Sequence, residues 1–339
     1  MAEFKIFTRG DFLITDATPE EPYRRRAEEE KFNVHWGQLK LMMTEIEFFC
    51  LFWYPETTPN PVVVYAGAAP GTHIPFLASM FPSFIFHLYD PRDFTITGTE
   101  QIHIHQQYFT DQDAAQWAGR NDVLFLSDIR TADHITMKDT ENEEAIMADM
   151  AMQERWYRII QPAQAHLKYR LPYTYDFAPK NVQGLYGFIF RQAWAPQTST
   201  ETRLVPIVPA RNFDWNVMKY QSQLFYHNSV VRETFKYFNP FDGSQNPIAP
   251  EMGLTNDYDS TMHIITIMDY LKKMGGEEAV TKENVLGLSE AIVTSIGRGL
   301  KSIKTIRDRI ARGIKKPTKP NKVKTRADTA KPKQWKPRK

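Results

Sequence analysis

Two kinds of hydrophobic pattern alternate along the first two thirds of the chain. Apolar residues at every third or fourth position predict helices over residues 36–53, 74–80 and 143–160. Short runs of β-branched and other apolar residues predict buried strands between and after these helices. The predicted strands cover residues 61–65, 84–89, 102–105, 122–127, 165–170, 185–191 and 201–208. This order predicts an α/β fold with a doubly wound, mostly parallel sheet and helices on both faces.

The C-terminal part has a different pattern. Apolar residues recur every three or four positions from Ile292 to Ile314, with Lys and Arg between them, which predicts a basic amphipathic helix. After Ile314 the chain is rich in Pro and Lys and has almost no apolar residues, so we expect it to be disordered. The sequence therefore divides into a folded domain at 1–285, a basic amphipathic helix at 286–314 and a disordered basic tail at 315–339.

Charge is unevenly distributed between the body and this tail. Residues 298–339 hold 17 Lys and Arg against 2 Asp, a charge of about +15, although the whole chain carries only +2. The remaining residues hold 25 basic and 38 acidic side chains, about −13. Such a tail is typical of segments that neutralise the phosphates of a nucleic acid or another polyanion. The alternative is a solvated terminus that serves only solubility.

Composition excludes several classes of protein. Among the 339 residues Cys50 is the single cysteine, which excludes a disulfide framework and a multi-cysteine zinc site. The most apolar stretch, residues 48–54, is too short to span a membrane, and the N-terminus lacks the apolar core of a signal peptide. We therefore expect neither membrane insertion nor secretion. His103 and His105 point the same way on a predicted strand, but no third ligand accompanies them, so no metal site is predicted.

Three predicted strands end in residues suited to binding a ligand. The loop Gly67–Gly71 follows one strand, and Asp90 and Asp128 follow two others. Because ligands bind beyond the carboxyl ends of parallel strands, these residues indicate one crevice. The loop has neither the Lys-Ser/Thr of a phosphate-binding loop nor the Gly-x-Gly-x-x-Gly of a dinucleotide site. An acid placed like Asp90 can accept the ribose hydroxyls of an adenosine, a layout typical of S-adenosylmethionine sites. The alternative is a structural turn with a capping Asp.

The sequence of this loop, Tyr65-Ala-Gly-Ala-Ala-Pro-Gly-Thr-His-Ile74, resembles the cofactor loop of ribose 2′-O-methyltransferases. Further motifs of one branch follow in order: Gly37–Lys40, Asp90–Arg92, Leu126–Arg130, Leu167–Arg170 and Ser199–Leu204. Together they resemble the poxviral cap-specific mRNA 2′-O-methyltransferases, which also serve as the small processivity subunit of the viral poly(A) polymerase. The resemblance extends over residues 36–237. It implies a Rossmann-like, S-adenosylmethionine-dependent methyltransferase domain within residues 1–285.

The resemblance implies transfer of a methyl group from S-adenosylmethionine to the ribose 2′-hydroxyl of the first transcribed nucleotide of capped mRNA. The family uses a Lys-Asp-Lys-Glu tetrad, which maps onto Lys40, Asp128, Lys168 and Glu201. Lys168 is then the general base. A lysine accepts a proton only after losing its own, which burial and a neighbouring cation favour and neighbouring carboxylates oppose. The sequence does not decide which effect dominates.

The same mapping assigns residues to the cofactor. Four would line the methionine side, namely Gln38, Tyr65, Gly67 and Gly71. Asp90 and Arg92 would face the adenosine, with Thr110 near the base, and Asp128 would border both cofactor and substrate.

In this family two aromatic rings enclose the methylated guanine of the cap and acids bind its edge. Tyr173 maps to one ring and Tyr23 to the other, and Arg170 is expected to contact RNA. Tyr175 and Gln221 stand where the family has acids, and Asp176 follows Tyr175. Cap selectivity is therefore predicted to be weaker or built differently, unless the register shifts so that Asp176 serves as the acid. The residues Ser199, Thr200 and Glu201 complete the predicted cap and RNA contacts.

The expected partners are capped mRNA and a poly(A) polymerase catalytic subunit, bound as a heterodimer. From the family we expect the protein in the host cytoplasm and in the virion. The alternative function is a non-catalytic, RNA-binding processivity subunit of a poly(A) polymerase.

Overall fold

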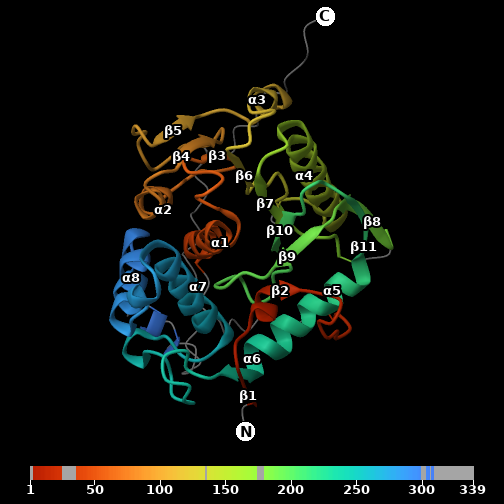
Figure 1. Ribbon diagram of the computed structural model, residues 1–339. Coiled ribbons are helices and arrows are strands. Elements are labelled where there is room, and N and C mark those ends of the chain that lie inside the picture. The colour runs from red at the N-terminus through yellow and green to blue at the C-terminus, as the bar shows by residue number, and fades with distance from the viewer. Residues whose placement is uncertain are drawn as a thin grey trace, which may run out of the picture.

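A computed structural model describes residues 3–24, 36–133, 136–173, 179–298, 303–305 and 307–308. Its centre is a sheet of eight strands in the order β2-β9-β10-β7-β6-β3-β4-β5 (Figure 1). These strands are β2 (Leu13–Ile14), β3 (Val62–Ala66), β4 (Ile85–Tyr89), β5 (Ile102–His105), β6 (Val123–Ser127), β7 (Gln164–Tyr169), β9 (Gly187–Phe190) and β10 (Thr202–Pro206). The strands from β7 to β5 in this order are parallel, and β10 runs antiparallel to both of its neighbours.

Helices cover both faces of this sheet. The side chains of β3 point alternately to the two faces of the sheet, so Val63 and Tyr65 belong to one buried cluster and Val62 and Val64 to the other. The first cluster is built with α1 (Gly37–Phe52), α2 (Ile74–Met80), α7 (Tyr258–Gly275) and α8 (Lys282–Ser295). The second is built with α3 (Asp111–Gln116), α4 (Asp139–Ile160) and α5 (Val217–Tyr226). The predicted doubly wound α/β fold is confirmed.

Shorter elements complete the described chain. Two small sheets pair β1 (Glu3–Lys5) with β12 (Phe235–Tyr237) and β8 (Asn181–Leu185) with β11 (Asn212–Asn216). The remaining helical turns are Arg9–Phe12, His227–Val231, α6 (Arg232–Thr234), Pro250–Met252 and Glu277–Ala279. The strand predicted at 185–191 corresponds to β9, and only its first residue, Leu185, belongs to β8.

Helical residues in the C-terminal part lie at 282–295 and, inside the helix predicted over 286–314, again at 303–305 and 307–308. The predicted boundary between residues 285 and 286 falls inside α8, whose residues Val285, Ile292 and Val293 are fully buried in the core of the body. The helix ends at Ser295, and Gly297 follows with a φ of 72°, a backbone conformation that stops a helix. Residues 286–295 therefore belong to the folded domain. The tail predicted at 315–339 lies outside the described residues.

Two further predictions concern membranes and metals. Over the described residues, no helix has the length and apolar character needed to cross a membrane. His103 and His105 both contact His87, whose ring stacks on His103 with centroids 4.6 Å apart. Within the same part of the chain, no group of three or more His, Cys, Asp or Glu could hold a metal ion.

Candidate active site

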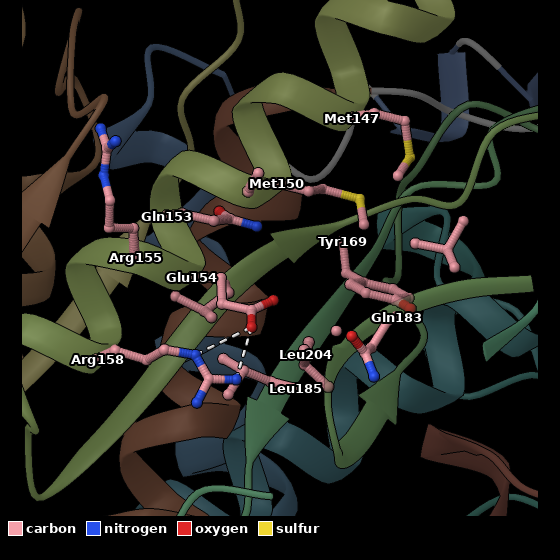
Figure 2. A pocket seen from close by; sticks show the side chains of 14 residues that line it. Met147, Met150, Gln153, Glu154, Arg155, Arg158, Tyr169, Gln183, Leu185 and Leu204 are labelled. Carbon is pink, nitrogen blue, oxygen red and sulfur yellow. Dashed lines mark hydrogen bonds and ion pairs between the residues drawn. The ribbon is translucent and has the colours of Figure 1, made fainter. Parts of the chain in front are cut away.

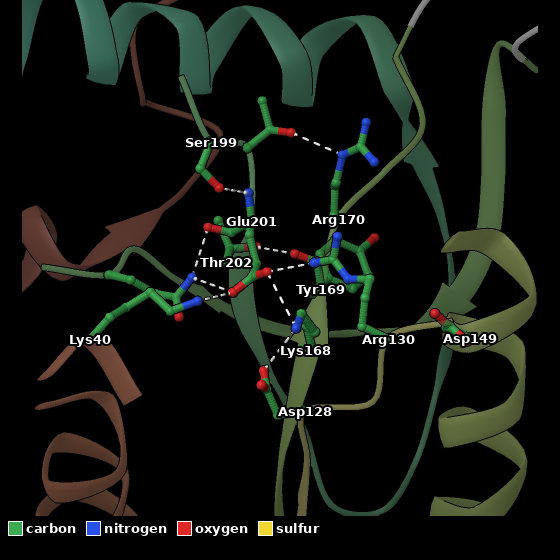
Figure 3. Close-up of polar contacts among 12 residues, drawn as sticks. Lys40, Asp128, Arg130, Asp149, Lys168, Tyr169, Arg170, Ser199, Glu201 and Thr202 are labelled. Carbon is green, nitrogen blue, oxygen red and sulfur yellow. Dashed lines mark hydrogen bonds and ion pairs between the residues drawn. The ribbon is translucent and has the colours of Figure 1, made fainter. Parts of the chain in front are cut away.

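The four residues of the predicted tetrad meet at one edge of the central sheet (Figure 3). Asp128 follows the last residue of β6, and Lys168 lies near the end of β7, whose Leu167 pairs with Ser127. Because β10 is antiparallel, its N-terminal end reaches this edge and places Glu201 beside them. Lys40 comes from the first turn of α1. Strand direction and register thus bring together side chains far apart in the sequence.

Lys168 lies between the two carboxylates of this cluster. Its Nζ is 3.1 Å from Asp128 Oδ1 and 3.5 Å from Glu201 Oε2. Lys40 Nζ donates to the other oxygen of Glu201. The four side chains are between 10% and 16% exposed, so little water screens their charges. The cluster can therefore hold a lysine amine in a fixed position between two carboxylates.

Two arginines, which sequence reasoning did not assign, complete the cluster. Arg203 Nη2 lies 2.7 Å from Asp128 Oδ1 and 3.4 Å from Glu201 Oε1, and its side chain is 1% exposed. Gln192 Oε1 accepts a hydrogen bond of 2.9 Å from Arg203 Nε, which fixes the guanidinium. Arg130 pairs with Glu201 at 2.6 Å. One sequence feature could have drawn attention to Arg203: it is the single charged residue in the otherwise uncharged strand β10.

The cluster contains more cations than carboxylates. Burial lowers the pKa of Lys40, and Arg203 lowers it further against the opposing effect of Glu201. Burial alone would raise the pKa of Glu201 and of Asp128, but Lys168 and the other cations outweigh it and hold both pKa values below their usual range. Both carboxylates are therefore ionised near neutral pH. With four cations around two anions, loss of one lysine proton relieves repulsion.

The loop after β3 approaches the cluster closely. Gly67 and Gly71 have φ values of 83° and 71°, which other residues rarely adopt. A side chain at Gly67 would place its Cβ 2.7 Å from the backbone nitrogen of Ile129 and 2.8 Å from the carbonyl carbon of Asp128. The loop therefore packs directly on the segment that follows β6, and only glycine permits this contact.

Asp90 and Arg92 bind each other in this structure. Asp90 is 2% exposed, and its two oxygens accept four hydrogen bonds: from the backbone nitrogens of Arg92 and Ala69, and from Nε and Nη2 of Arg92. A carboxylate has about four acceptor sites, so these bonds fill it. A ribose hydroxyl would have to displace one of them. Thr110 caps α3, where its hydroxyl donates to Asp113 at 2.6 Å.

A buried polar network lies between α1 and the loop. Both oxygens of Glu45 are engaged, one accepting from the Tyr65 hydroxyl at 2.7 Å and the other bonded to His73 Nε2 at 2.8 Å. His73 Nδ1 lies 2.9 Å from Gln38 Oε1. Glu45 and His73 are each 1% exposed. They therefore fix Gln38 and Tyr65, two of the residues predicted to line the methionine side of a cofactor.

The predicted aromatic pair is also brought together. The rings of Tyr23 and Tyr173 lie 5.5 Å apart between centroids and are tilted by 31°, and Phe225 packs edge-on against Tyr23. At this separation the two tyrosine rings touch, so a base between them requires them to move apart. The Arg170 guanidinium lies 4.3 Å from the centroid of the Tyr173 ring. Figure 3 shows Arg170 beside the tetrad.

Glu143, another residue missed in the sequence, orders this part of the site. Its carboxylate binds the Arg170 guanidinium at 2.6 Å and accepts a 3.1 Å hydrogen bond from the backbone nitrogen of Tyr173. The neighbouring predicted residues have structural contacts, since Thr200 Oγ1 accepts from Arg170 Nε at 3.3 Å and Ser199 Oγ accepts from the backbone nitrogen of Glu201 at 3.1 Å.

Two of the predicted cap contacts lie outside the described residues, namely Tyr175 and Asp176. Gln221 is buried on α5, with 3% of its surface exposed.

Comparison with known proteins identifies the family. A family model described as the poly A polymerase regulatory subunit matches residues 9–298. The chain belongs to this family. It is 26% identical over 316 residues to the cap-specific mRNA (nucleoside-2′-O-)-methyltransferase of Fowlpox virus (strain NVSL), a match that covers 85% of this chain and 94% of that protein. It is also 26% identical over 226 residues to the protein of the same name from Myxoma virus (strain Lausanne), covering 60% of this chain and 65% of that relative. The resemblance found in the motifs is confirmed.

The close contact at Gly67 leads to a prediction about stability for this family member. Gly67→Ala should lower the free energy of unfolding by at least about 3 kcal/mol, because it combines a strained backbone with a collision against backbone atoms that cannot move aside. Gly119→Ala is the matched control, since Gly119 has a φ of 75° with no atom within 4 Å of its Cβ position. Urea unfolding measures both losses: the loss in Gly119→Ala reports backbone strain alone, and the additional loss in Gly67→Ala reports the collision of its Cβ with the backbone of Asp128 and Ile129. Equal losses in the two would contradict a tight contact at Gly67.

Proposed function

We propose that this protein is an S-adenosylmethionine-dependent methyltransferase that acts on the ribose 2′-hydroxyl of the first transcribed nucleotide of capped mRNA. The observation that carries the proposal is the position of Lys168, held between Asp128 and Glu201 where β6, β7 and β10 meet. The names of the relatives support it, since two of them are called cap-specific mRNA (nucleoside-2′-O-)-methyltransferases.

Lys168 is proposed as the general base. A ribose hydroxyl is a poor nucleophile at neutral pH, and removal of its proton during attack contributes typically 10²- to 10⁴-fold to the rate. Asp128 and Glu201 fix the position of the amine, and Arg203 and Lys40 in turn bind these two carboxylates. Fixed placement of the base beside the hydroxyl supplies a further part of the rate.

The residues around the Gly67–Gly71 loop fit a cofactor with an adenosine and an amino-acid end. The loop, Asp90 and Asp128 come from the carboxyl ends of three adjacent parallel strands, which is where such ligands bind. S-adenosylmethionine, when bound, supplies an electrophilic methyl group. Gln38 and Tyr65 would hold its methionine end, and Arg92 would release part of Asp90 to the ribose.

The cap is proposed to bind between Tyr23 and Tyr173. A methylated guanine carries a positive charge, so a ring on each face provides cation–π attraction of about 0.5–2 kcal/mol. Arg170 lies where it can contact a phosphate of the cap, held there by Glu143. Gln221 can bond a guanine edge but adds no charge complementarity.

Methyl transfer from labelled S-adenosylmethionine to a pair of short RNAs, one with a methylated-guanosine cap and one without, tests the proposal. We expect transfer to the capped RNA only, and Tyr173→Ala should raise KM for the capped RNA by about tenfold. Equal transfer to both RNAs would contradict recognition of the cap and leave only the proposed methyl transfer to ribose. No transfer to either RNA, with RNA binding intact, would favour the non-catalytic alternative.

A second function, as the regulatory subunit of a poly(A) polymerase, is favoured by the description of the matching family model. The expected partner is a polymerase catalytic subunit, bound as a heterodimer. Length distributions of poly(A) made by a cognate catalytic subunit, with and without this protein, test it. We expect the catalytic subunit to add a longer poly(A) tail each time it binds RNA when this protein is present. Unchanged lengths, with no complex on gel filtration, would contradict this role.

The buried network behind the loop gives a prediction about the cofactor. Glu45→Gln should weaken binding of S-adenosylhomocysteine by about tenfold and raise KM for the methyl donor, with little change in kcat, because it replaces one of the two acceptor oxygens that position Tyr65 and His73 with an amide nitrogen. Isothermal titration calorimetry measures this change. The control is Glu47→Gln on the same helix, because Glu47 is also buried but the carboxylate bonded to Tyr65 and His73 is that of Glu45. Equal effects of the two variants would contradict a role for Glu45 in positioning.

A further inference from the structure

The loop between β9 and β10 covers residues 191–201 and ends at Glu201. The ladder that joins β10 to β7 begins at Thr202, so Glu201 lies one residue outside it. Its Oε2 atom nevertheless lies 3.5 Å from Lys168 Nζ, and its backbone nitrogen donates to the Ser199 hydroxyl within the loop (Figure 3). The position of the Glu201 carboxylate therefore depends on how the loop is held as well as on the pairing of the sheet.

Two buried side chains from outside the loop bind its backbone. Arg232 donates from Nη2 to the carbonyl oxygen of Ala195 at 2.8 Å and from Nη1 to that of Pro196 at 3.3 Å. Asn228 Nδ2 donates to the carbonyl oxygen of Ser199 at 2.9 Å. Each of these two donor residues is 5% exposed. Because a buried carbonyl that loses its donor destabilises the fold, these contacts favour one conformation of the loop.

The two donors also bind each other and a buried carboxylate. Arg232 Nη1 donates to Asn228 Oδ1 at 3.2 Å, and Arg232 Nη2 lies 2.9 Å and 3.2 Å from the two oxygens of Asp259. Asp259 Oδ1 in turn accepts a 3.0 Å hydrogen bond from the backbone nitrogen of Trp194 in the loop. Trp194 has a φ of 62°, which a bulky residue rarely adopts, and such a conformation persists only where the surroundings enforce it. The network therefore holds both the first and the last part of the loop.

Asn228 and Arg232 lie four residues apart where α5 continues into a π-helical turn, His227–Val231. Such turns frequently occur at functional sites. We infer that these two residues are positioning residues: they hold the loop so that the Glu201 carboxylate keeps the Lys168 amine in place. They act through the backbone of the loop and not by touching substrate or cofactor. This inference rests on the proposed methyl transfer, in which Lys168 is the base.

Asn228→Ala tests the inference, because it removes one neutral donor and leaves the ion pair of Arg232 and Asp259 in place. The rate constant of single-turnover methylation of capped RNA should fall about 10- to 100-fold, the effect of a misplaced catalytic group, while affinity for S-adenosylhomocysteine stays unchanged. Asn228→Asp should give the same loss, because it keeps the oxygen that accepts from Arg232 but no longer donates to the loop. A full rate in both variants would overturn the inference.

The matched control is Asn239→Ala. Asn239 is also buried, at 2% exposed, but its side chain accepts a 3.0 Å hydrogen bond from the backbone nitrogen of Phe241, outside this loop. The control should keep the full rate. Equal losses of rate in Asn239→Ala and Asn228→Ala would overturn the inference, because the loss would then follow from removing any buried amide.

A double-mutant cycle with Glu201→Gln separates positioning from a purely structural role. If Asn228 acts through Glu201, Asn228→Ala should lower the rate by less than about twofold once that carboxylate is gone. The same 10- to 100-fold loss in both backgrounds would overturn the inference.

Hydrogen exchange supplies a readout that does not depend on activity. Asn228→Ala should speed exchange of the Glu201 backbone amide, and Asn239→Ala should not. Unchanged exchange in Asn228→Ala would overturn the hold on the loop, even if the wild type methylates capped RNA. Absence of methylation by the wild type, together with faster exchange in Asn228→Ala, would instead overturn the proposed function and with it the role of the loop in catalysis. The two failures are therefore distinguishable.

Discussion

Replacing Lys168 with alanine should lower the rate of methyl transfer to capped RNA by about 10²- to 10⁴-fold, the range expected for loss of a positioned base. RNA and cofactor affinity should change little, because Asp128 and Glu201 keep Arg203 as a counter-ion. The variant should also lose the rise of kcat with pH that titration of a base produces. Single-turnover methylation measured from pH 6 to pH 10 checks both effects.

Lys40→Ala is the matched control for this experiment. Lys40 lies on the other side of Glu201 and is buried to a similar degree, so it removes the same charge from the same cluster. We expect a smaller loss of rate and a pH profile that keeps its rising limb. If Lys40→Ala abolished methylation and Lys168→Ala did not, the base would be Lys40, whose pKa burial already lowers.

Replacing Arg203 with methionine should lower the free energy of unfolding at pH 7 by about 3–5 kcal/mol, the cost of removing one partner from a buried ion pair. The guanidinium is 1% exposed and lies within hydrogen-bonding distance of Asp128 and Gln192. Without it, Lys168 is the one remaining cation that pairs with Asp128 among the residues that the structure describes. Urea unfolding measures the loss. Arg130→Met is the control, because Arg130 pairs with Glu201 from a side chain that is 36% exposed and should cost no more than about 1 kcal/mol.

The pH dependence of this loss has a definite sign. The folded pKa values of Asp128 and Glu201 lie below their unfolded values, so their contribution to stability is full above about pH 4.5 and is lost as the pH falls through the folded pKa values. Arg203→Met should raise both folded pKa values. The variant should therefore lose less stability than the wild type between pH 7 and pH 3. A parallel shift of the two curves would contradict the pairing seen in the structure.

The sequence by itself determined the architecture of the body. Continuous apolar strands such as residues 61–65, alternating with helical patterns, predicted a sheet covered on both faces, and the structure has it. The apolar pattern of each segment was enough for this prediction, because a strand that is buried on both faces must be apolar throughout. Motif order likewise identified the family. It also predicted a tetrad of four residues that strand direction brings together, and the catalytic role of these residues stays a prediction.

Other features depended on the tertiary structure. The sequence placed Asp90 at a strand end but did not show that Arg92 fills its acceptor sites. The sequence also did not show which carboxylates Arg203 would bind or that Glu143 would bind Arg170. Strand register sets Arg203 opposite Lys168, and the packing of α4 on the sheet brings Glu143 to Tyr173. The pocket drawn in Figure 2 likewise forms only where α4 packs beside β7, β8 and β10, segments that are distant in the sequence. A local pattern specifies which face of an element is buried, whereas partners for buried charges are chosen by register and packing between distant segments.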